Sequence, residues 1–362
     1  MKSNLALPAA ALAALLLVPA FGQAQNSAAL TASLMPAVKI SGPPGAVQLV
    51  QYSSDLTGSN GWTTIGSVWI SNTNPVYFGD PSGIGAPIRF YRSQTVSLVD
   101  SNLVWIPPGT FTMGSPETEQ GRSANEGPQT QVTFTRGFFM GRYLVRDAEW
   151  LNYMTNLPAA LLGSSLPDST NYALPVRSIH WTDATSYCAL RTAAELAAGK
   201  IPAGWAYRLP TEVEWEYACR AGTTTAFNLG TTLRNEIGEQ DACFDGTRPY
   251  PTNLVAGGGI VPAFPVTVGS YQPNGFGLYD MHGNVAEFCQ DVYATQANLT
   301  GYSGGSITNP VAHVESPANY VMTRGGAFGL DGSSCRSAKR FLRPTGTLYG
   351  FIGFRVVLAP AP

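Results

Sequence analysis

The sequence is poor in charge, in histidine and in closely spaced cysteines. Asp, Glu, Lys and Arg make up 12% of its 362 residues, about half of the share that is usual in globular proteins. The formal net charge is −2, so the chain lacks the positive field that binding to nucleic acid requires. It has three histidines and no Cys-x-x-Cys, which argues against a structural zinc site. We therefore expect neither a nucleic-acid partner nor such a zinc site.

Glycine, proline and aromatic residues are abundant instead. The chain has 39 Gly, 27 Pro, 16 Tyr, 16 Phe and 7 Trp. Gly and Pro favour turns, and aromatic side chains dominate small cores. Apolar residues reach 44%, which at this length allows one large domain and a small one. These features predict a loop-rich, aromatic-rich fold of an extracellular type.

The N-terminus carries an export signal. Lys2 precedes an apolar run over residues 5–21, and Gly22-Gln23-Ala24 supplies small residues at a cleavage position. This pattern predicts a signal peptide over residues 1–24. The alternative is an uncleaved membrane anchor, for which the run is at the short limit. We expect cleavage, and hence an exported, periplasmic or secreted protein with no membrane segment after the signal is removed.

Five cysteines remain, at positions 188, 219, 243, 289 and 335. Export implies an oxidising compartment, where disulfides persist. The odd count leaves at least one free thiol or one bridge to another chain. The sequence alone leaves the pairing open.

Two folded regions follow the signal. Residues 25–35 are small and polar and predict a linker. Residues 36–98 hold short alternating apolar segments between turn signals, which predicts a small all-β sandwich. Its aromatic residues could bind a glycan, but we expect them to fill the core. Residues 100–358 combine few helices with short strands and long loops, which predicts an irregular α+β domain.

Helix signals in the second region are local. A first helix is expected near residues 146–155, and a second from Thr182 as N-cap to about residue 198. The third is the best marked, because Thr211 and Glu214 form a capping box and Gly222 lies just past the end.

Three groups of motifs carry a family resemblance. Residues 105–115 read WIPPGTFTMGS, residues 207–218 read YRLPTEVEWEYA, and residues 274–288 read NGFGLYDMHGNVAEF. Arg-Gly-Gly at 324–326 and Gly-Phe-Arg at 353–355 follow. In this order they resemble the sulfatase-modifying-factor, or formylglycine-generating enzyme, family. The resemblance covers residues 100–358 and implies a variant of the C-type lectin fold.

The resemblance also implies a chemistry, which the sequence departs from. Family enzymes use oxygen and Cu(I) to convert a sulfatase cysteine to formylglycine, and two thiolates after Arg-Gly-Gly hold the metal. Cu(I) is soft and favours such ligands. Here the segment 325–340 contains Cys335 alone, and Ala286 and Phe288 replace two family tryptophans. We therefore expect the copper site to be absent.

Cys335 and Cys289 are the catalytic candidates that remain. Cys289 lies just after the Asn284 loop, which borders the active cleft in the family. We hypothesise that Cys289 approaches Cys335 and restores a dithiol or a disulfide. The alternative is that Cys335 is a packed core thiol, because a free cysteine behaves as a small apolar residue.

Calcium is the second metal that the resemblance implies. Family members bind it through oxygen ligands in two loops, and Asn284 and Glu287 retain oxygens of the hard type that calcium prefers. The other loop has Cys243 where an asparagine is usual. One calcium site is therefore expected, and turn formation with hydrogen bonding is the alternative role for Asn284 and Glu287.

The remaining polar candidates have structural explanations. Glu212, Glu214 and Glu216 lie in or near a helix start, and we expect capping and salt bridges instead of acid–base catalysis. His180 and His282 have no second ligand at metal spacing, so we expect hydrogen bonding.

Two functions follow from these expectations. The first is a binding module for a protein or a glycan that lacks the oxidase site. The alternative is an active oxidase that acts on a sulfatase. The fold alone does not decide between them, because function resides in the site.

Overall fold

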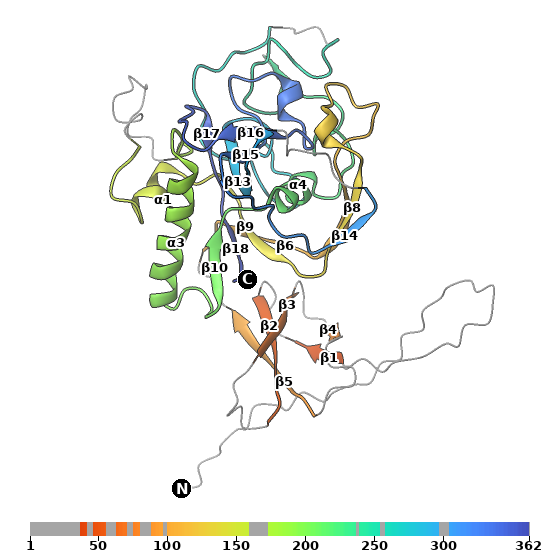
Figure 1. The fold of residues 1–362 in the computed structure, drawn as a ribbon, viewed down its shortest axis with the longest axis vertical. Coiled ribbons are helices and arrows are strands. Elements are labelled where there is room, and N and C mark those ends of the chain that lie inside the picture. Colours follow the sequence, from red (N-terminus) through yellow and green to blue (C-terminus); the bar gives the residue numbers. More distant parts are fainter. Residues whose placement is uncertain are drawn as a thin grey trace, which may run out of the picture. The chain divides into compact units, whose positions relative to one another are not determined.

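The computed structural model describes residues 37–41, 46–55, 63–70, 75–79, 88–96, 100–158, 173–236, 239–253, 258–296 and 304–361. The chain divides into two units, Met1–Val99 and Asp100–Pro362, which Figure 1 draws in sequence colours. The predicted signal peptide and linker, residues 1–35, lie outside the described residues. Within those residues, no helix has the length and apolar character needed to cross a bilayer.

Every described element of the first unit is a strand. They are β1 (Ala37–Ile40), β2 (Ala46–Ser53), β3 (Thr63–Ile70), β4 (Val76–Gly79) and β5 (Phe90–Val96). Antiparallel pairing gives one sheet in the order β3-β2-β5 and another of β1 and β4. Side chains from both sheets share one buried cluster, made of Val38, Ile40, Val50 and Ile70. In β1 the burial alternates with the period of two that a half-buried strand requires.

The second unit holds four sheets and three α-helices among its described residues. The helices are α1 (Asp147–Leu151), α3 (Trp181–Ala197) and α4 (Glu212–Arg220), and the 3-10 turns are η2 (Ala124–Glu126) and η4 (Gly332–Cys335). The strands are β6 (Leu103–Ile106), β7 (Gly109–Met113), β8 (Thr130–Phe134), β9 (Phe138–Gly141), β10 (Trp205–Arg208), β11 (Asn235–Glu236), β12 (Glu239–Gln240), β13 (Ala286–Tyr293), β14 (Ser306–Thr308), β15 (Tyr320–Arg324), β16 (Phe341–Pro344), β17 (Ile352–Gly353) and β18 (Val357–Pro360).

The sheets of this unit join segments from its two ends. Their orders are β10-β18-β9-β6, β16-β15-β13-β17, β14-β8-β7 and β11-β12. Helix α3 runs beside β10, and α4 lies near the middle of the unit (Figure 1). Trp215 of α4 is fully buried in a cluster with side chains of β6, β13 and β18. Few helices, short strands and long loops confirm the predicted α+β class.

Helix α4 starts where the sequence places it. The Thr211 hydroxyl accepts a hydrogen bond from Glu214 N at 3.1 Å, and the Glu214 carboxylate accepts one from Thr211 N at 2.9 Å. These bonds satisfy donors that the first turn leaves open. The helix ends at Arg220, its C-cap Ala221 has a φ of +45°, and Gly222 follows. The predicted capping box and end are therefore confirmed.

The other two helices depart from the prediction. Helix α3 has His180 as its N-cap, not Thr182, because the Asp183 carboxylate reaches back to accept from His180 N at 2.9 Å. Helix α1 ends at Leu151 instead of continuing to residue 155. The chain turns after it, and the Trp150 indole donates to Asn156 O at 2.8 Å. Met154 N still donates to Trp150 O at 2.9 Å, so one turn follows the helix before the chain leaves the helical path.

Candidate functional site

The glycine-rich segment 325–340 begins with a tight turn that encloses a thiol. Gly325 and Gly326 have φ angles of +90° and +72°, which favour glycine. A Cβ added to Gly326 would lie 2.5 Å from the Cys335 sulfur and 2.9 Å from Ser334 O. Cys335 at the end of η4 therefore packs directly against the Gly-Gly turn.

Cys335 has the surroundings of a core residue. Its side chain is fully buried with Phe227, Phe244 and Tyr250, and Sγ lies 3.6 Å from Asp331 O. Burial raises the pKa of the Cys335 thiol far above its ordinary value, and the nearby Asp331 charge adds to the effect. The thiol is therefore protonated at neutral pH, as the packed-thiol alternative expects.

Cys289 lies in a different buried cluster. That cluster contains Trp215 of α4 and Met281, whereas Cys335 belongs to the one around Phe227. Burial raises the pKa of Cys289 well above its ordinary value. All five cysteines are buried free thiols. The proposed disulfide between Cys289 and Cys335 is therefore not formed in this structure.

The donor set of the segment does not fit Cu(I). Cuprous ion needs thiolate ligands that it can reach. The segment offers one enclosed, protonated sulfur on Cys335. Leu330 in the same segment has an apolar side chain, and its backbone hydrogen-bonds to Ala327 and Asp245.

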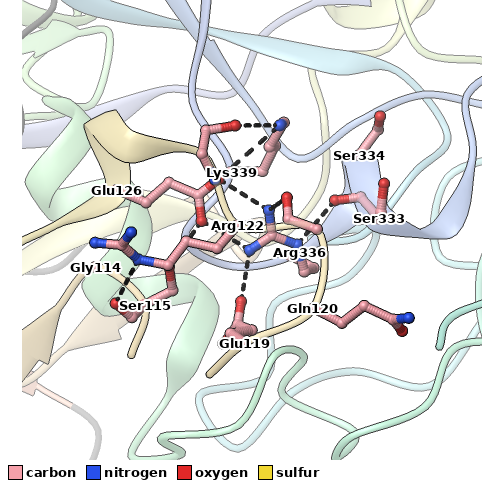
Figure 2. A network of polar contacts seen from close by, with 12 residues as sticks. Gly114, Ser115, Glu119, Gln120, Arg122, Glu126, Ser333, Ser334, Arg336 and Lys339 are labelled. Atoms are coloured by element: carbon pink, nitrogen blue, oxygen red, sulfur yellow. Dashed lines mark hydrogen bonds and ion pairs between the residues drawn. The ribbon is translucent and has the colours of Figure 1, made fainter. Parts of the chain in front are cut away.

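An enclosed ion-pair network fixes the same segment to η2 (Figure 2). Arg336 donates to both carboxylate oxygens of Glu126, at 2.7 and 2.8 Å, and to Glu119 at 2.6 Å. The side chains of Arg336 and Glu126 are 0% exposed. Burial raises the pKa of Glu126, but the hydrogen bonds and charge of Arg336 outweigh it, so the pKa lies below its ordinary value. The network holds the loop rigidly in place.

The three glutamates around α4 are bound to arginines. Glu212 pairs with Arg340 at 2.7 Å, Glu214 with Arg208 at 2.6 Å, and Glu216 with Arg220 at 2.9 Å. Glu216 also contacts Arg324. Each carboxylate therefore has a fixed structural partner, and the predicted capping and salt-bridge roles are confirmed.

Asn284 makes a paired contact with the backbone of Val266. Its side-chain oxygen accepts from Val266 N at 3.1 Å, and its side-chain nitrogen donates to Val266 O at 3.2 Å. Its φ is +63°, a conformation that asparagine adopts more readily than most residues. The side chain thus hydrogen-bonds its own positive-φ position to the Val266 segment, in line with the hydrogen-bonding role considered as the alternative.

Glu287 is neutralised by Arg355. Arg355 donates to the two carboxylate oxygens at 2.6 and 2.8 Å, and both side chains are 0% exposed. In the described part of the chain, no group of three or more His, Cys, Asp or Glu side chains could hold a metal. Calcium needs several free oxygen ligands. The Glu287 carboxylate is engaged by Arg355 and the Asn284 amide by Val266, so these two side chains do not fit the calcium site that the resemblance implies.

His282 has both ring nitrogens in hydrogen bonds. Nδ1 lies 2.8 Å from Cys335 O, and Nε2 accepts from Asn228 N at 3.1 Å. Burial lowers the pKa of His282 to about 4, so the ring is neutral. The Cys219 sulfur is 3.8 Å from Nε2, but burial raises the pKa of Cys219 to about 12. This pair cannot form a thiolate and an imidazolium at neutral pH, so it is not an activated nucleophile.

A groove of about 540 Å³ lies between α3 and β10. Its volume is in the range of small-molecule sites. Its walls are mainly apolar, and Arg208 at its edge is paired with Glu214. The lining residues are Trp181, Thr185, Cys188, Ala189, Thr192, Ala193, Leu196, Ala206, Tyr207, Arg208, Leu209 and Gln290. The sequence reasoning missed this groove; the small residues Ala189 and Ala193 on one helix face are the signal that could have indicated it.

Comparison with known proteins agrees with this architecture. The model of the sulfatase-modifying factor enzyme 1-like domain matches residues 92–360. The chain belongs to this family. The match covers the whole second unit except its last two residues, and it begins within the end of the first.

Several relatives are similar in sequence or structure to this chain. The formylglycine-generating enzyme of Thermomonospora curvata is 27% identical over 311 residues, which cover 72% of this chain and 95% of that protein. The formylglycine-generating enzyme of Mus musculus is 29% identical over 238 residues, covering 53% of this chain and 58% of that protein. The solved structure of PvdO from Pseudomonas aeruginosa superposes with a TM-score of 0.53 at 28% identity, over 71% of this chain and 93% of that one.

Proposed function

We propose that this protein is an exported sulfatase-modifying-factor family member that binds a glycan or a protein and does not oxidise cysteine. One observation carries the proposal. The sulfur in the glycine-rich segment, on Cys335, is enclosed by Gly326 and by aromatic side chains. A copper oxidase of the family type would need two reachable thiolates at this place.

The polar interior of the loop supports the same conclusion. Arg336 and Glu126 form a fully enclosed ion pair that joins the glycine-rich segment to η2. Removing either partner would leave a buried charge without its two-point counter-charge, which is costly. The segment therefore has little freedom to move Cys335 toward a substrate or a second thiol.

Binding is supported by surfaces that have room for a ligand. The groove between α3 and β10 has a volume of about 540 Å³ with apolar walls. The first unit adds a second folded region made of strands. A sulfatase is one candidate protein partner, since relatives of this chain carry the name formylglycine-generating enzyme.

The second candidate function is the oxidase itself. It is favoured by the similarity to the Thermomonospora curvata enzyme, which extends over 95% of that protein. An assay separates the two functions. The full chain is incubated with Cu(I), oxygen and a Cys-x-Pro-x-Arg peptide, and the peptide is followed by mass spectrometry.

We expect no change in peptide mass, and no cuprous ion held against a competing chelator. The Thermomonospora curvata enzyme, treated identically, serves as the positive control. A glycan array and a pull-down with sulfatases then test binding. Formation of the aldehyde peptide by this chain would overturn the proposal, and saturable glycan or protein binding without it would support the proposal.

A further inference from the structure

Arg343 on β16 lies among three aromatic rings. Its guanidinium carbon is 5.0 Å from the ring centre of Phe341, 5.3 Å from that of Tyr349 and 5.5 Å from that of Phe351. All four side chains are half-buried. These distances are within the range of cation–π attraction.

Among the described residues, the guanidinium has no counter-charge of the kind that several enclosed arginines have. Arg336, Arg340 and Arg355 each pair with a glutamate. For Arg343, the described residues provide no ion pair or side-chain hydrogen bond, and its Nε is buried without a partner. Burial lowers the pKa of Arg343 below its ordinary value. A half-enclosed cation with unused donors has free energy to gain from an anion.

We propose that Arg343, Phe341, Tyr349 and Phe351 form a binding site for an acidic carbohydrate, a sugar unit that carries a carboxylate or a sulfate. This inference rests on the proposed function as a binding module. The anionic group accepts hydrogen bonds from the guanidinium, and the apolar C–H face of the sugar packs on the rings. Leu348, which is 50% exposed in the adjacent loop, extends the apolar surface.

The strand geometry favours a sugar over an acidic peptide. A peptide would gain most by adding a strand to β16, which is the outer strand in the order β16-β15-β13-β17. But β16 has four residues and ends at Pro344, and proline has no amide hydrogen to donate to a ladder. A sugar ring needs no such ladder, and its rigidity limits the loss of conformational entropy on binding.

The test is a titration of the full chain with defined ligands. Oligogalacturonates represent sugars with a carboxylate, and heparin-derived oligosaccharides represent sugars with a sulfate. Cello-oligosaccharides are the neutral control. An aspartate-rich peptide represents acidic peptides, the competing class of ligand. Isothermal titration calorimetry at two salt concentrations measures each. We expect an acidic sugar to bind, and Arg343→Gln and Tyr349→Ala each to weaken that binding by about tenfold or more, the scale of one lost charged hydrogen bond.

Arg136→Gln is the matched control, because Arg136 is an exposed arginine elsewhere in the same unit. It should bind acidic sugars as the unmodified chain does. Unchanged affinity in Arg343→Gln, or binding of the peptide alone, overturns the inference. If no acidic sugar binds while a neutral glycan or a protein does, this inference fails and the proposed function stands. If only peptide oxidation is found, both fail.

Discussion

Arg336 and Glu126 form a two-point ion pair in which neither side chain reaches solvent. The pair joins the glycine-rich segment to η2 across 210 residues of sequence. A buried pair of this kind contributes little net stability compared with apolar packing, but breaking it is costly. It therefore fixes the position of the loop more than it adds to the overall free energy.

The first prediction concerns this pair. Glu126→Gln leaves the buried Arg336 charge with Glu119 as its remaining carboxylate partner, and we expect a loss of about 3 kcal/mol in the free energy of unfolding. Urea denaturation followed by fluorescence measures it. Glu117→Gln, at an exposed position of the same segment, should change stability by less than about 0.5 kcal/mol. Equal effects of the two substitutions would refute the structural role of the pair.

The second prediction concerns the contact between Gly326 and Cys335. Gly326→Ala meets the sulfur at 2.5 Å at a φ of +72°, so we expect a loss of about 2–4 kcal/mol from strain and overpacking. Adding Cys335→Ala should recover only part of it, since Cys335 Cα also lies 2.9 Å from the new Cβ. A double-mutant cycle from thermal denaturation gives the coupling. Strict additivity would mean that the sulfur is not the obstacle.

Thiol access gives the third prediction. All five cysteines are buried and free, so a small alkylating reagent should modify none of them in the native protein over minutes. All five should react after denaturation without reductant. Mass spectrometry counts the adducts. A rapidly modified Cys335 in the native state would support the oxidase alternative, and fewer than five adducts after denaturation would reveal a disulfide.

The fourth prediction concerns pH. The folded-state pKa of His282 is lowered to about 4 from 6.5, so the unfolded chain binds the extra proton first as the pH falls. The contribution of neutral His282 to the free energy of unfolding is fully present above pH 6.5. It falls by roughly 3 kcal/mol between pH 6.5 and about 4. The contribution of Asp291 to the free energy of unfolding changes with the opposite sign in the same pH range. Burial raises its folded-state pKa to about 7, so the folded protein binds this proton first as the pH falls.

The His282 contribution is separated from others by a variant. The difference in unfolding free energy between the unmodified chain and His282→Gln should shrink by roughly 3 kcal/mol from pH 7 to pH 4. Chemical denaturation at several pH values measures it. A difference that stays constant with pH would show that His282 keeps an ordinary pKa in the folded state.

The fifth prediction concerns calcium. Glu287 is paired with Arg355 and Asn284 with Val266, so neither calcium nor a chelator should shift the midpoint of thermal unfolding. Glu287→Gln should lower stability by about 3 kcal/mol with or without the ion. Calorimetry with and without calcium tests both statements. A calcium-dependent rise in the midpoint that Glu287→Gln abolishes would restore the expected site.

Local signals in the sequence predict some features of the fold well and others poorly. Thr211 and Glu214 lie three residues apart and cap α4 as expected, because all the atoms involved are close in sequence. The N-cap of α3 was misplaced, since Asp183 reaches back to His180 in preference to the threonine pattern. The β-rich first region and the loop-rich second region follow from turn residues and strand patterns alone.

The candidate site depends on contacts that no local pattern contains. Arg336 meets Glu126, and Arg343 meets Tyr349 and Phe351, only after the chain has folded. The absence of a second cysteine near Cys335 is visible in the sequence, but the burial of its sulfur is not. The family resemblance locates the candidate site in the sequence. The contacts of each side chain there depend on tertiary packing.

The outer strand β16 also bears on how copies of the protein behave toward one another. An uncovered strand edge invites pairing with a second chain and is a common origin of aggregation. β16 is short, carries the charge of Arg343 and ends at Pro344. These three properties are those by which natural sheets discourage edge-to-edge association. Arg343 and Pro344 therefore also disfavour edge-to-edge pairing between copies of the chain.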